Sequence, residues 1–294
     1  MQDTKKEGDR MKNTMKKPVA IPVEKLRSFA GHPFKVRDDD EMNTLIESVQ
    51  TQGILSPLIV RPIENTDEYE VISGHRRLHA AQKAGISEVP ALIYALDRDA
   101  AAIAVVDSNL HREHILPSEK AFAYKLKRDA MAHQGRTSPQ LGEKTLTVEK
   151  IGAEAGDSKN QVLRYIRLTH LIPELLDLMD EGKIALMVGE ALSYLGDKEQ
   201  YAVLEQCEMN DCTPSYAQAI EMKKRYQGRN LTIENISEIL SREKANQRET
   251  IKIPTEKLRK YAPNADAKQL EDFILKACEY YRKFLIRQRN RDER

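Results

Sequence analysis

The spacing of apolar residues changes once along the chain, near Asp99, and this change limits the folds open to the sequence. Before Asp99, short runs of β-branched and aromatic residues alternate with Gly, Pro and Asn turns, a pattern typical of strands mixed with short helices. After it, apolar residues recur at helical spacing. The sequence therefore predicts an α+β protein with a small mixed α/β domain over 21–107 and an all-α domain over 108–240.

The expected elements follow from this pattern. In the first domain the acidic run at 38–41 suits the start of a helix, and Gly53 suits its end. Strands are expected at 21–23, 58–60, 69–72 and 89–94, with a second helix at 75–84. Helices are expected in the second domain at 100–109, 117–132, 148–155, 159–168, 173–181, 187–195, 197–207 and 215–226.

The two ends of the chain differ from the middle. Residues 1–20 are rich in lysine and lack an apolar core, which predicts a disordered basic tail and excludes a signal peptide. A polar linker is expected over 241–250. It leads into a C-terminal segment, 251–294, with a short strand at 251–253 and a long amphipathic helix over 266–288.

Composition excludes several classes of protein. Lys and Arg number 47 against 46 Asp and Glu, so the overall charge does not indicate a polyanion partner. No apolar run approaches the roughly 20 residues that span a bilayer, so no membrane association is expected. The three cysteines have no CxxC spacing, which argues against a disulfide framework and a zinc knuckle. We expect a cytoplasmic protein.

Catalytic and metal-binding patterns are weak. His75 with His79, and His111 with His114, have spacings that can chelate zinc, but no cysteine or carboxylate pattern accompanies them. No Gly-x-Ser-x-Gly turn occurs, so a Ser/His/Asp hydrolase is not indicated. The sequence predicts neither a catalytic residue nor a metal site.

Residues 148–168 have the pattern of a helix-turn-helix. Gly156 and Asp157 separate two short helices, and Ser158 with Gln161 forms a predicted capping box at the start of the second. No acidic residue lies between Ser158 and His170, so the outer face carries one sign of charge. Lys and Arg neutralise phosphates, and Asn, Gln and Arg read base edges in the major groove. An ordinary helical hairpin is the alternative. The predicted DNA-binding residues are Ser158, Lys159, Asn160, Gln161, Arg164 and Arg167.

Two polar segments, 74–77 and 108–113, suggest a pocket for an anion. The first, Gly74-His75-Arg76-Arg77, follows a strand and opens a helix, which brings helix-start N–H groups beside two guanidinium groups. The second, 108–113, ends the next helical segment. If the two segments pack together, three arginines and one amide converge; otherwise they are solvated surface groups. Below they are called the arginine box and the asparagine box.

Several motifs in fixed order resemble the ParB family of partition proteins. Residues 53–61 are similar to its first nucleotide-pocket motif, 69–81 to its Gly-Glu-Arg-Arg box, and 108–113 with 117–119 to its Glu-Asn-x-x-Arg box. The helix-turn-helix follows at the expected distance, and 172–175 and 181–184 are also similar to the family. The resemblance covers about 21–240.

The resemblance implies a function and a site. A dimer of such a protein loads on a centromere-like DNA site, and CTP bound between the boxes closes a clamp that slides along the duplex. A partner ATPase of the ParA type would bind the basic N-terminal tail. Carried over to this sequence, the nucleotide-binding residues are Gly74, Arg76, Arg77, Asn109 and Arg112.

Three positions depart from the family pattern. His75 and Ser108 stand where the family has Glu, and Ser56 stands where it has Gln. The two replaced carboxylates are those expected near a divalent metal, and imidazole and hydroxyl groups are poor Mg²⁺ ligands. The sequence therefore leaves Mg²⁺ binding, CTP hydrolysis and the choice of nucleotide open.

The C-terminal segment matches the family least. Its expected helix has a broad apolar stripe that one strand and one helix cannot bury alone. We expect this stripe to form a homodimer, with packing on the central helices as the alternative. Basic residues follow that can add nonspecific phosphate contacts, with a solvated tail as the alternative. The stripe consists of Leu270, Phe273, Ile274, Ala277, Tyr280, Tyr281 and Phe284.

Taken together, the sequence predicts a nucleoid-associated DNA-binding partition protein of a chromosome, plasmid or integrative element. One alternative is a local helix-turn-helix transcription regulator that does not spread on DNA. The other is a nucleotide-hydrolysing enzyme with the same N-terminal fold, against which the missing carboxylates at His75 and Ser108 count.

Overall fold

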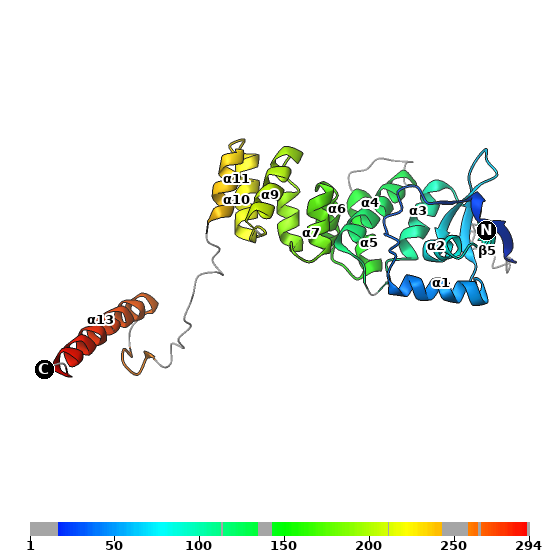
Figure 1. Ribbon diagram of the computed structural model, residues 1–294. Coiled ribbons are helices and arrows are strands. Elements are labelled where there is room, and N and C mark those ends of the chain that lie inside the picture. The colour runs from blue at the N-terminus through cyan, green and yellow to red at the C-terminus, as the bar shows by residue number, and fades with distance from the viewer. Residues whose placement is uncertain are drawn as a thin grey trace, which may run out of the picture. The chain divides into compact units, whose positions relative to one another are not determined.

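The computed structural model describes residues 17–112, 114–134, 143–210, 212–242, 258–263 and 266–292 (Figure 1). The chain divides into two compact units, Met1–Arg242 and Glu243–Arg294. The first holds both the predicted α/β domain and the predicted helical domain. Among the described residues, no helix combines the length and the apolar character that crossing a membrane requires.

A five-stranded mixed sheet forms the centre of the N-terminal domain. The strand order is β1-β5-β3-β4-β2, with antiparallel β1·β5 and β3·β4 pairs and parallel β2·β4 and β3·β5 pairs. Because β1 begins at Val19, the sheet extends into the segment expected as a tail; residues 1–16 of that segment lie outside the described residues. The strands are β1 (Val19–Pro22), β2 (Leu26–Ser28), β3 (Leu58–Pro62), β4 (Tyr69–Ser73) and β5 (Glu88–Ile93).

Helices cover both faces of this sheet. Val71 and Ile72 are adjacent in β4 and therefore point to opposite faces. Val71 belongs to the apolar core under α1 (Asp40–Gln52) and α2 (His75–Lys83), and Ile72 belongs to the core under α3 (Arg98–Asp107). The predicted start and end of α1 are confirmed, since Asp39 caps it by accepting from the Met42 amide at 2.8 Å, and Gly53 follows with φ 69°.

The second half of this unit is helical, as predicted. Its largest core is formed by buried aliphatic residues of α6 to α11, with Leu168, Leu175, Leu192, Met222 and Ile236 fully enclosed. The helices are α4 (Pro117–Gln134), α5 (Glu143–Ala155), α6 (Lys159–Leu168), α7 (Pro173–Asp180), α8 (Leu186–Leu192), α9 (Asp197–Met209), α10 (Tyr216–Gln227) and α11 (Ile233–Ser241).

Lys127 on α4 joins the two halves. Its side chain is 2% exposed and forms ion pairs with Asp107 at the end of α3 and with Glu154 on α5. Burial alone would lower the pKa of Lys127, but the hydrogen bonds and charges of the two carboxylates outweigh burial and raise it. One buried ammonium group therefore links the last helix of the α/β domain to the first helix of the helix-turn-helix.

A second joint lies at the start of α4. Ser118 donates to Asp180 of α7 through its amide at 3.0 Å and its hydroxyl at 2.6 Å. Lys35, in the loop between β2 and α1, forms ion pairs with Asp177 and Asp180. The loop, α4 and α7 are thus held together by charge-assisted contacts.

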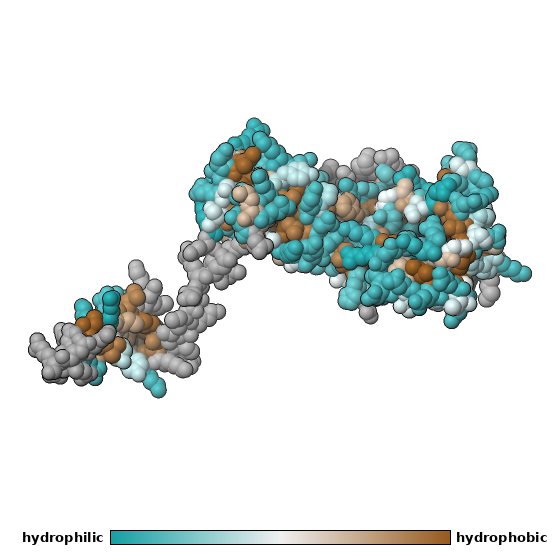
Figure 2. Space-filling model, in the orientation of Figure 1, coloured by the Kyte–Doolittle hydropathy of each residue, from teal (hydrophilic) through white to brown (hydrophobic). Residues whose placement is uncertain are grey.

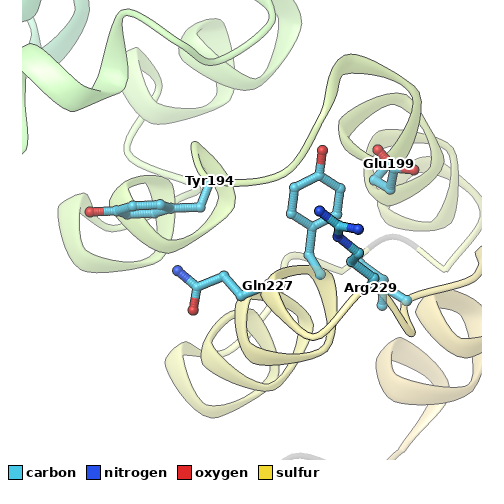
Figure 3. A pocket seen from close by; sticks show the side chains of 6 residues that line it. Tyr194, Glu199, Gln227 and Arg229 are labelled. Carbon is cyan, nitrogen blue, oxygen red and sulfur yellow. The ribbon is translucent and has the colours of Figure 1, made fainter.

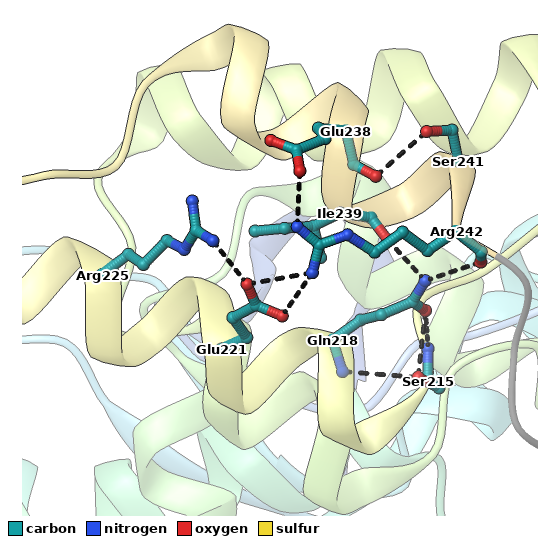
Figure 4. A network of polar contacts seen from close by, with 8 residues as sticks. All are labelled: Ser215, Gln218, Glu221, Arg225, Glu238, Ile239, Ser241 and Arg242. Atoms are coloured by element: carbon teal, nitrogen blue, oxygen red, sulfur yellow. Dashed lines mark hydrogen bonds and ion pairs between the residues drawn. The ribbon is translucent and has the colours of Figure 1, made fainter.

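The end of the helical domain is closed by a polar network between α10 and α11 (Figure 4). Arg242 bridges Glu221 at 3.1 Å and Glu238 at 2.6 Å, and Arg225 also pairs with Glu221. Gln218 donates to the Ile239 carbonyl at 2.8 Å and so binds the last turn of α11. The network fixes α11 against α10 immediately before the segment expected as a linker.

In the second unit the predicted long helix is present as α13 (Ala267–Asp292). Leu270 is buried, but most other large apolar side chains of this helix are exposed, and Figure 2 shows apolar residues gathered along it. The predicted strand at 251–253 lies outside the described residues, as does 243–250 of the expected linker. The exposed residues are Phe273, Leu275, Tyr280, Tyr281, Phe284, Leu285 and Ile286.

The Lys127 joint generates a stability prediction. Lys127→Ala removes a buried cation and leaves two carboxylates without their ion-pair partner. Each of these side chains is about half exposed to water. We expect the free energy of unfolding in urea to fall by about 2 kcal/mol, below the cost of breaking a wholly buried pair because water hydrates the freed acids. Lys125→Ala on the same helix should cost less than about 0.5 kcal/mol. Equal losses would show that the ion pairs do not hold the joint.

Candidate nucleotide pocket and DNA-binding surface

The arginine box begins at a turn that requires glycine. Gly74 links β4 to α2 with φ +105°, a backbone region that side chains rarely adopt. A Cβ atom there would lie 3.0 Å from Leu58 Cγ and 3.2 Å from Arg77 Nη2. The turn leads directly into the first N–H groups of α2, and N–H groups at a helix start favour an anion.

The next residue, His75, is stacked on a second histidine. Its ring centroid lies 3.7 Å from that of His32, at an interplanar angle of 37°. His32 Nδ1 lies 2.8 Å from the Phe34 carbonyl oxygen, and His75 has a backbone hydrogen bond to Val71. The Nε2 atoms of both rings are buried and have no hydrogen-bond partner among the described residues.

The electrostatics of this pair keep both rings neutral. Burial lowers the pKa of His75 to about 3, and His32 and Arg112 act in the same direction. Burial also lowers the pKa of His32, with a further contribution from Arg112. The carboxylate expected here from the family pattern is thus replaced by an uncharged ring.

Arg112 of the asparagine box lies against the loop that carries His32. Its guanidinium carbon lies 5.6 Å from the centre of the Phe34 ring, and Phe34 packs edge-on against His32. Partial burial lowers the pKa of Arg112, Glu119 opposes this, and the charge of Arg76 lowers it further. Two guanidinium groups that repel one another beside a helix start form a site suited to a polyanion.

The other predicted pocket residues have partners within the chain. Arg76 pairs with Glu41 at 3.1 Å and Asp39 at 3.7 Å on the exposed side of α1. Arg77 donates to the carbonyl oxygens of Ser56 and of Pro57, the latter at 2.9 Å.

Asn109 is buried and donates from Nδ2 to the Val105 carbonyl at 2.7 Å. Arg77 and Asn109 therefore have hydrogen-bond partners within the chain, and direct contact of either with a nucleotide stays a prediction.

The pocket does not fit Mg²⁺. Both Glu119 oxygens accept from backbone amides, of Lys35 at 2.8 Å and Leu116 at 3.1 Å. Mg²⁺ prefers carboxylate oxygens and water, whereas the unpartnered atoms here are imidazole nitrogens. The described residues contain no group of three or more His, Cys, Asp or Glu side chains that can hold a metal ion by itself.

The helix-turn-helix has the predicted geometry. Ser158 caps α6 by accepting from the Gln161 amide at 3.3 Å, which is half of the predicted capping box. Val162 and Ile166 are buried against Ile151 of α5. The opposite face of α6 carries Lys159, Asn160, Gln161, Arg164 and Arg167, each at least partly exposed.

The turn of this motif is anchored on α4. Tyr124 donates to Asp157 at 2.5 Å, and Lys120 pairs with the same carboxylate at 2.7 Å. The ammonium of Lys120 also lies 4.9 Å from the centre of the Tyr165 ring on α6. Helix α4 thus fixes the angle between α5 and α6.

The cations on α6 have intramolecular partners of different strength. Lys159 pairs with Glu149 at 3.1 Å and Arg164 with Glu190 at 3.3 Å, both near the surface, where such pairs contribute about 1 kcal/mol or less. Phosphates can replace these partners. Arg167 is held more firmly, because it donates to the Ser193 carbonyl at 2.8 Å and lies over the Tyr194 ring.

Two further residues, Leu163 and Lys223, lie near the predicted DNA-binding side chains but were not predicted from the sequence. Leu163 is 44% exposed on the outer face of α6, where an apolar side chain can contact a thymine methyl group. Lys223 of α10 lies 3.5 Å from the centre of the Tyr194 ring. It is far in sequence from the helix-turn-helix. Helical spacing identifies Leu163, but contacts between α6, α8 and α10 are not visible in sequence.

A shallow pocket adjoins Tyr194 (Figure 3). Figure 3 shows Tyr194 and Glu199 on opposite sides of it, with Gln227 and Arg229 between them. It is open to solvent and lies away from the arginine box in sequence. We assign it no ligand.

Comparison with known proteins places these features in a family context. A family model described as "ParB N-terminal domain" matches residues 5–110. A chromosome-partitioning protein Spo0J of Thermus thermophilus is 33% identical over 183 residues, covering 62% of each chain. A nucleoid occlusion protein of a Geobacillus species is 31% identical over 204 residues, covering 69% of this chain and 67% of its own length.

One solved structure is also similar. It is a C-terminally truncated chromosome-partitioning protein ParB from Caulobacter crescentus complexed with CTP-gamma-S, 27% identical, with a TM-score of 0.31. The match covers 64% of this chain and 97% of that one. Against the Thermus thermophilus relative, the match spans less than two thirds of the relative's length.

Gly74→Ala tests the turn of the arginine box. The variant combines a positive φ with a close contact to Leu58, so we expect a loss of about 2 kcal/mol in unfolding free energy. Gly85→Ala is the matched control, since Gly85 also has a positive φ but nothing lies within 4 Å of the added carbon. The difference between the two variants, measured in urea, isolates the contact; no difference would show that the turn tolerates a side chain.

The histidine pair predicts a pH dependence of stability. His75 titrates near 6.5 in the unfolded chain and about 3 in the folded one, so the unfolded chain binds more protons between these values. The contribution of His75 to the free energy of unfolding is therefore complete above about pH 6.5. It is lost as the pH falls toward 3, by at most about 1.4 kcal/mol per pH unit. His75→Gln should flatten this slope, and His111→Gln, which changes an exposed residue, should not. An unchanged slope in His75→Gln would contradict the assignment.

Proposed function

This chain belongs to the ParB family, and we propose that it is a sequence-specific DNA-binding partition protein that loads on a centromere-like site and spreads as a nucleotide-gated clamp. The helix-turn-helix supplies DNA binding and the two boxes supply nucleotide binding. Bound nucleotide changes the position of the α/β domain relative to the helical domain, and thereby whether a dimer encloses DNA.

The observation that carries this proposal is the closeness of Arg112, in the asparagine box, to Arg76 and His75 in the arginine box. Arg112 follows α3 and lies close enough to Arg76 and to the histidine pair to act on their charges. The same helix α3 ends at Asp107, which pairs with Lys127 and so with Glu154 of α5. A polyanion between the arginines would act on a helix that is tied directly to the DNA-binding motif.

The gating follows from differential binding. A ligand shifts a conformational equilibrium only as far as it binds one state better than the other. A triphosphate relieves the repulsion between Arg76 and Arg112 only when both boxes are close together. It would therefore favour the state in which they are packed.

The nucleotide in this proposal is CTP, which the resemblance of the motifs to the ParB family implies. The further components are also proposals: a homodimer through the exposed apolar stripe of α13, a ParA-type ATPase as partner, and association with the nucleoid. Hydrolysis is not part of the proposal, because His75 and Ser108 supply no carboxylate.

Arg76→Ala tests the link between nucleotide and DNA. The variant removes one of two cations at the pocket and leaves α6 unchanged. We expect CTP affinity to fall at least about 10-fold while affinity for a short DNA site in the absence of nucleotide stays within about 2-fold.

Lys83→Ala is the control. Lys83 lies on the same helix and forms a surface ion pair with Asp38, so this variant should retain CTP binding. Loss of DNA binding in Arg76→Ala would mean that the arginine is structural.

Arg164→Ala tests direct reading of DNA. If Arg164 leaves Glu190 and contacts a base, specific binding should weaken by about 1–3 kcal/mol and binding to random DNA much less. Lys159→Ala should weaken both alike, as expected for a phosphate contact. Fluorescence anisotropy at fixed salt measures the two. Equal losses for specific and random DNA in Arg164→Ala would assign it to a phosphate.

A further inference from the structure

The cations near the recognition helix fall into two groups that differ in their partners. Lys159 and Arg164, on the outer face of α6, each form an ion pair with a glutamate of the chain. Arg167 at the end of α6, Lys125 of α4 and Lys223 of α10 are partly exposed and form no ion pair in the part of the chain that the structure describes. The second group is therefore free to bind an outside anion without first giving up a carboxylate.

Tyr194, in the turn after α8, brings two of these cations together. The guanidinium carbon of Arg167 lies 4.2 Å from the centre of its ring, and the ammonium nitrogen of Lys223 lies 3.5 Å from it. Arg167 also donates to the Ser193 carbonyl at 2.8 Å. An aromatic ring attracts a cation over its face. One ring thus keeps two like charges close to each other that would otherwise move apart.

Lys125 belongs to the same surface. The exposed residue His170 follows α6, and partial burial lowers the pKa of its ring. The charges of Arg167, Lys125 and Arg128 lower this pKa further, so all three cations lie near His170. Arg128 pairs with Asp129 at 2.6 Å, whereas Lys125 has no such partner among the described residues.

These cations lie where a recognition helix leaves the bases. Asn160, Arg164 and Arg167 follow one another at helical spacing and form one row along α6. In a helix-turn-helix, the N-terminal residues of the second helix contact base edges. The C-terminal end of the row, where Arg167 lies, is left for the phosphates at the edge of the groove. The nearby acid Glu199 lies across the adjoining pocket from Tyr194 (Figure 3).

We propose that Lys125, Arg167 and Lys223, here called the basic flank, bind DNA phosphates beside the bases that α6 reads, with Tyr194 as the positioning residue for two of them. This inference rests on the DNA binding of the proposed function. It assigns to the basic flank the part of the affinity that does not depend on sequence, because its cations lose no ion pair on binding. A DNA duplex fits this surface better than an acidic protein does, since the flank continues the row of α6.

The test is a titration of the full chain with a random-sequence DNA duplex at several salt concentrations. Each phosphate contact that is lost lowers the slope of log affinity against log salt by about 0.9. Lys125→Gln and Lys223→Gln should each show this loss and should weaken binding about 5-fold at fixed salt. Lys83→Gln removes the same charge from the α/β domain, where Lys83 pairs with Asp38, and should leave the slope unchanged.

Two variants of Tyr194 test its positioning role. Tyr194→Phe keeps the ring and should keep both the affinity and the salt slope. Tyr194→Leu keeps an apolar side chain but no longer holds Arg167 and Lys223, so it should weaken binding to random DNA. Adding Lys223→Gln to Tyr194→Leu should then weaken binding less than Lys223→Gln does alone, which a purely structural role of the ring does not predict. Circular dichroism checks that each variant is folded.

The outcomes distinguish this inference from the proposed function. Unchanged salt slopes in both Lys125→Gln and Lys223→Gln overturn the basic flank, and leave this surface to an acidic protein. Losses confined to a duplex that the protein selects from random sequence also overturn it, because they indicate base reading. If the natural protein prefers no sequence, the proposed sequence-specific function fails, while lowered slopes in the two variants would still support the flank.

Discussion

The ion pairs of Lys127 are the interaction on which the arrangement of the first unit depends. A buried ammonium group is costly unless charged partners surround it, and its two partners come from helices on either side of α4. The end of α3, the middle of α4 and the end of α5 must therefore stay together. The asparagine box lies at the same end of α3, so a change there cannot move that helix without affecting the helix-turn-helix.

The surroundings of the two boxes are the opposite case, since they bring like charges near one another, with acidic groups only on the outer sides: Glu41 and Asp39 at Arg76, and Glu119 near Arg112. Arg76 and Arg112 repel each other, and the two imidazoles beside them are kept neutral by burial and by Arg112. A bound anion would reduce the repulsion between the two arginines. This is the physical reason why the proposed nucleotide would act on conformation, because the repulsion grows as the boxes approach.

Much of this organisation follows from the sequence. The change of apolar spacing near Asp99 predicts the sheet and the helices, and the capping residue Ser158 and the one-signed face predict the recognition helix. The sequence left open whether the two boxes pack together; the structure places Arg112 against Phe34, next to the His32 ring that lies on His75, and a shared site stays a prediction.

Other features could not be predicted from the sequence, because they are contacts between segments that are far apart in the chain. His32 lies far from both boxes in the chain, so its stacking on His75 has no sequence pattern. The same holds for the hydrogen bonds of Arg77 to the carbonyl oxygens of Ser56 and Pro57. Capping and periodicity are local, whereas these contacts depend on how two loops, one between β2 and α1 and one between α1 and β3, lie against the start of α2.

The most direct test of the clamp is chromatin immunoprecipitation in the host, read across the chromosome and any plasmids, for the natural protein and for Arg76→Ala side by side. The account predicts a peak that extends far beyond one site for the natural protein and a sharp peak at the same locus for the variant. A sharp peak of operator size in both would contradict spreading, and would identify a local regulator that binds DNA without a nucleotide-gated clamp.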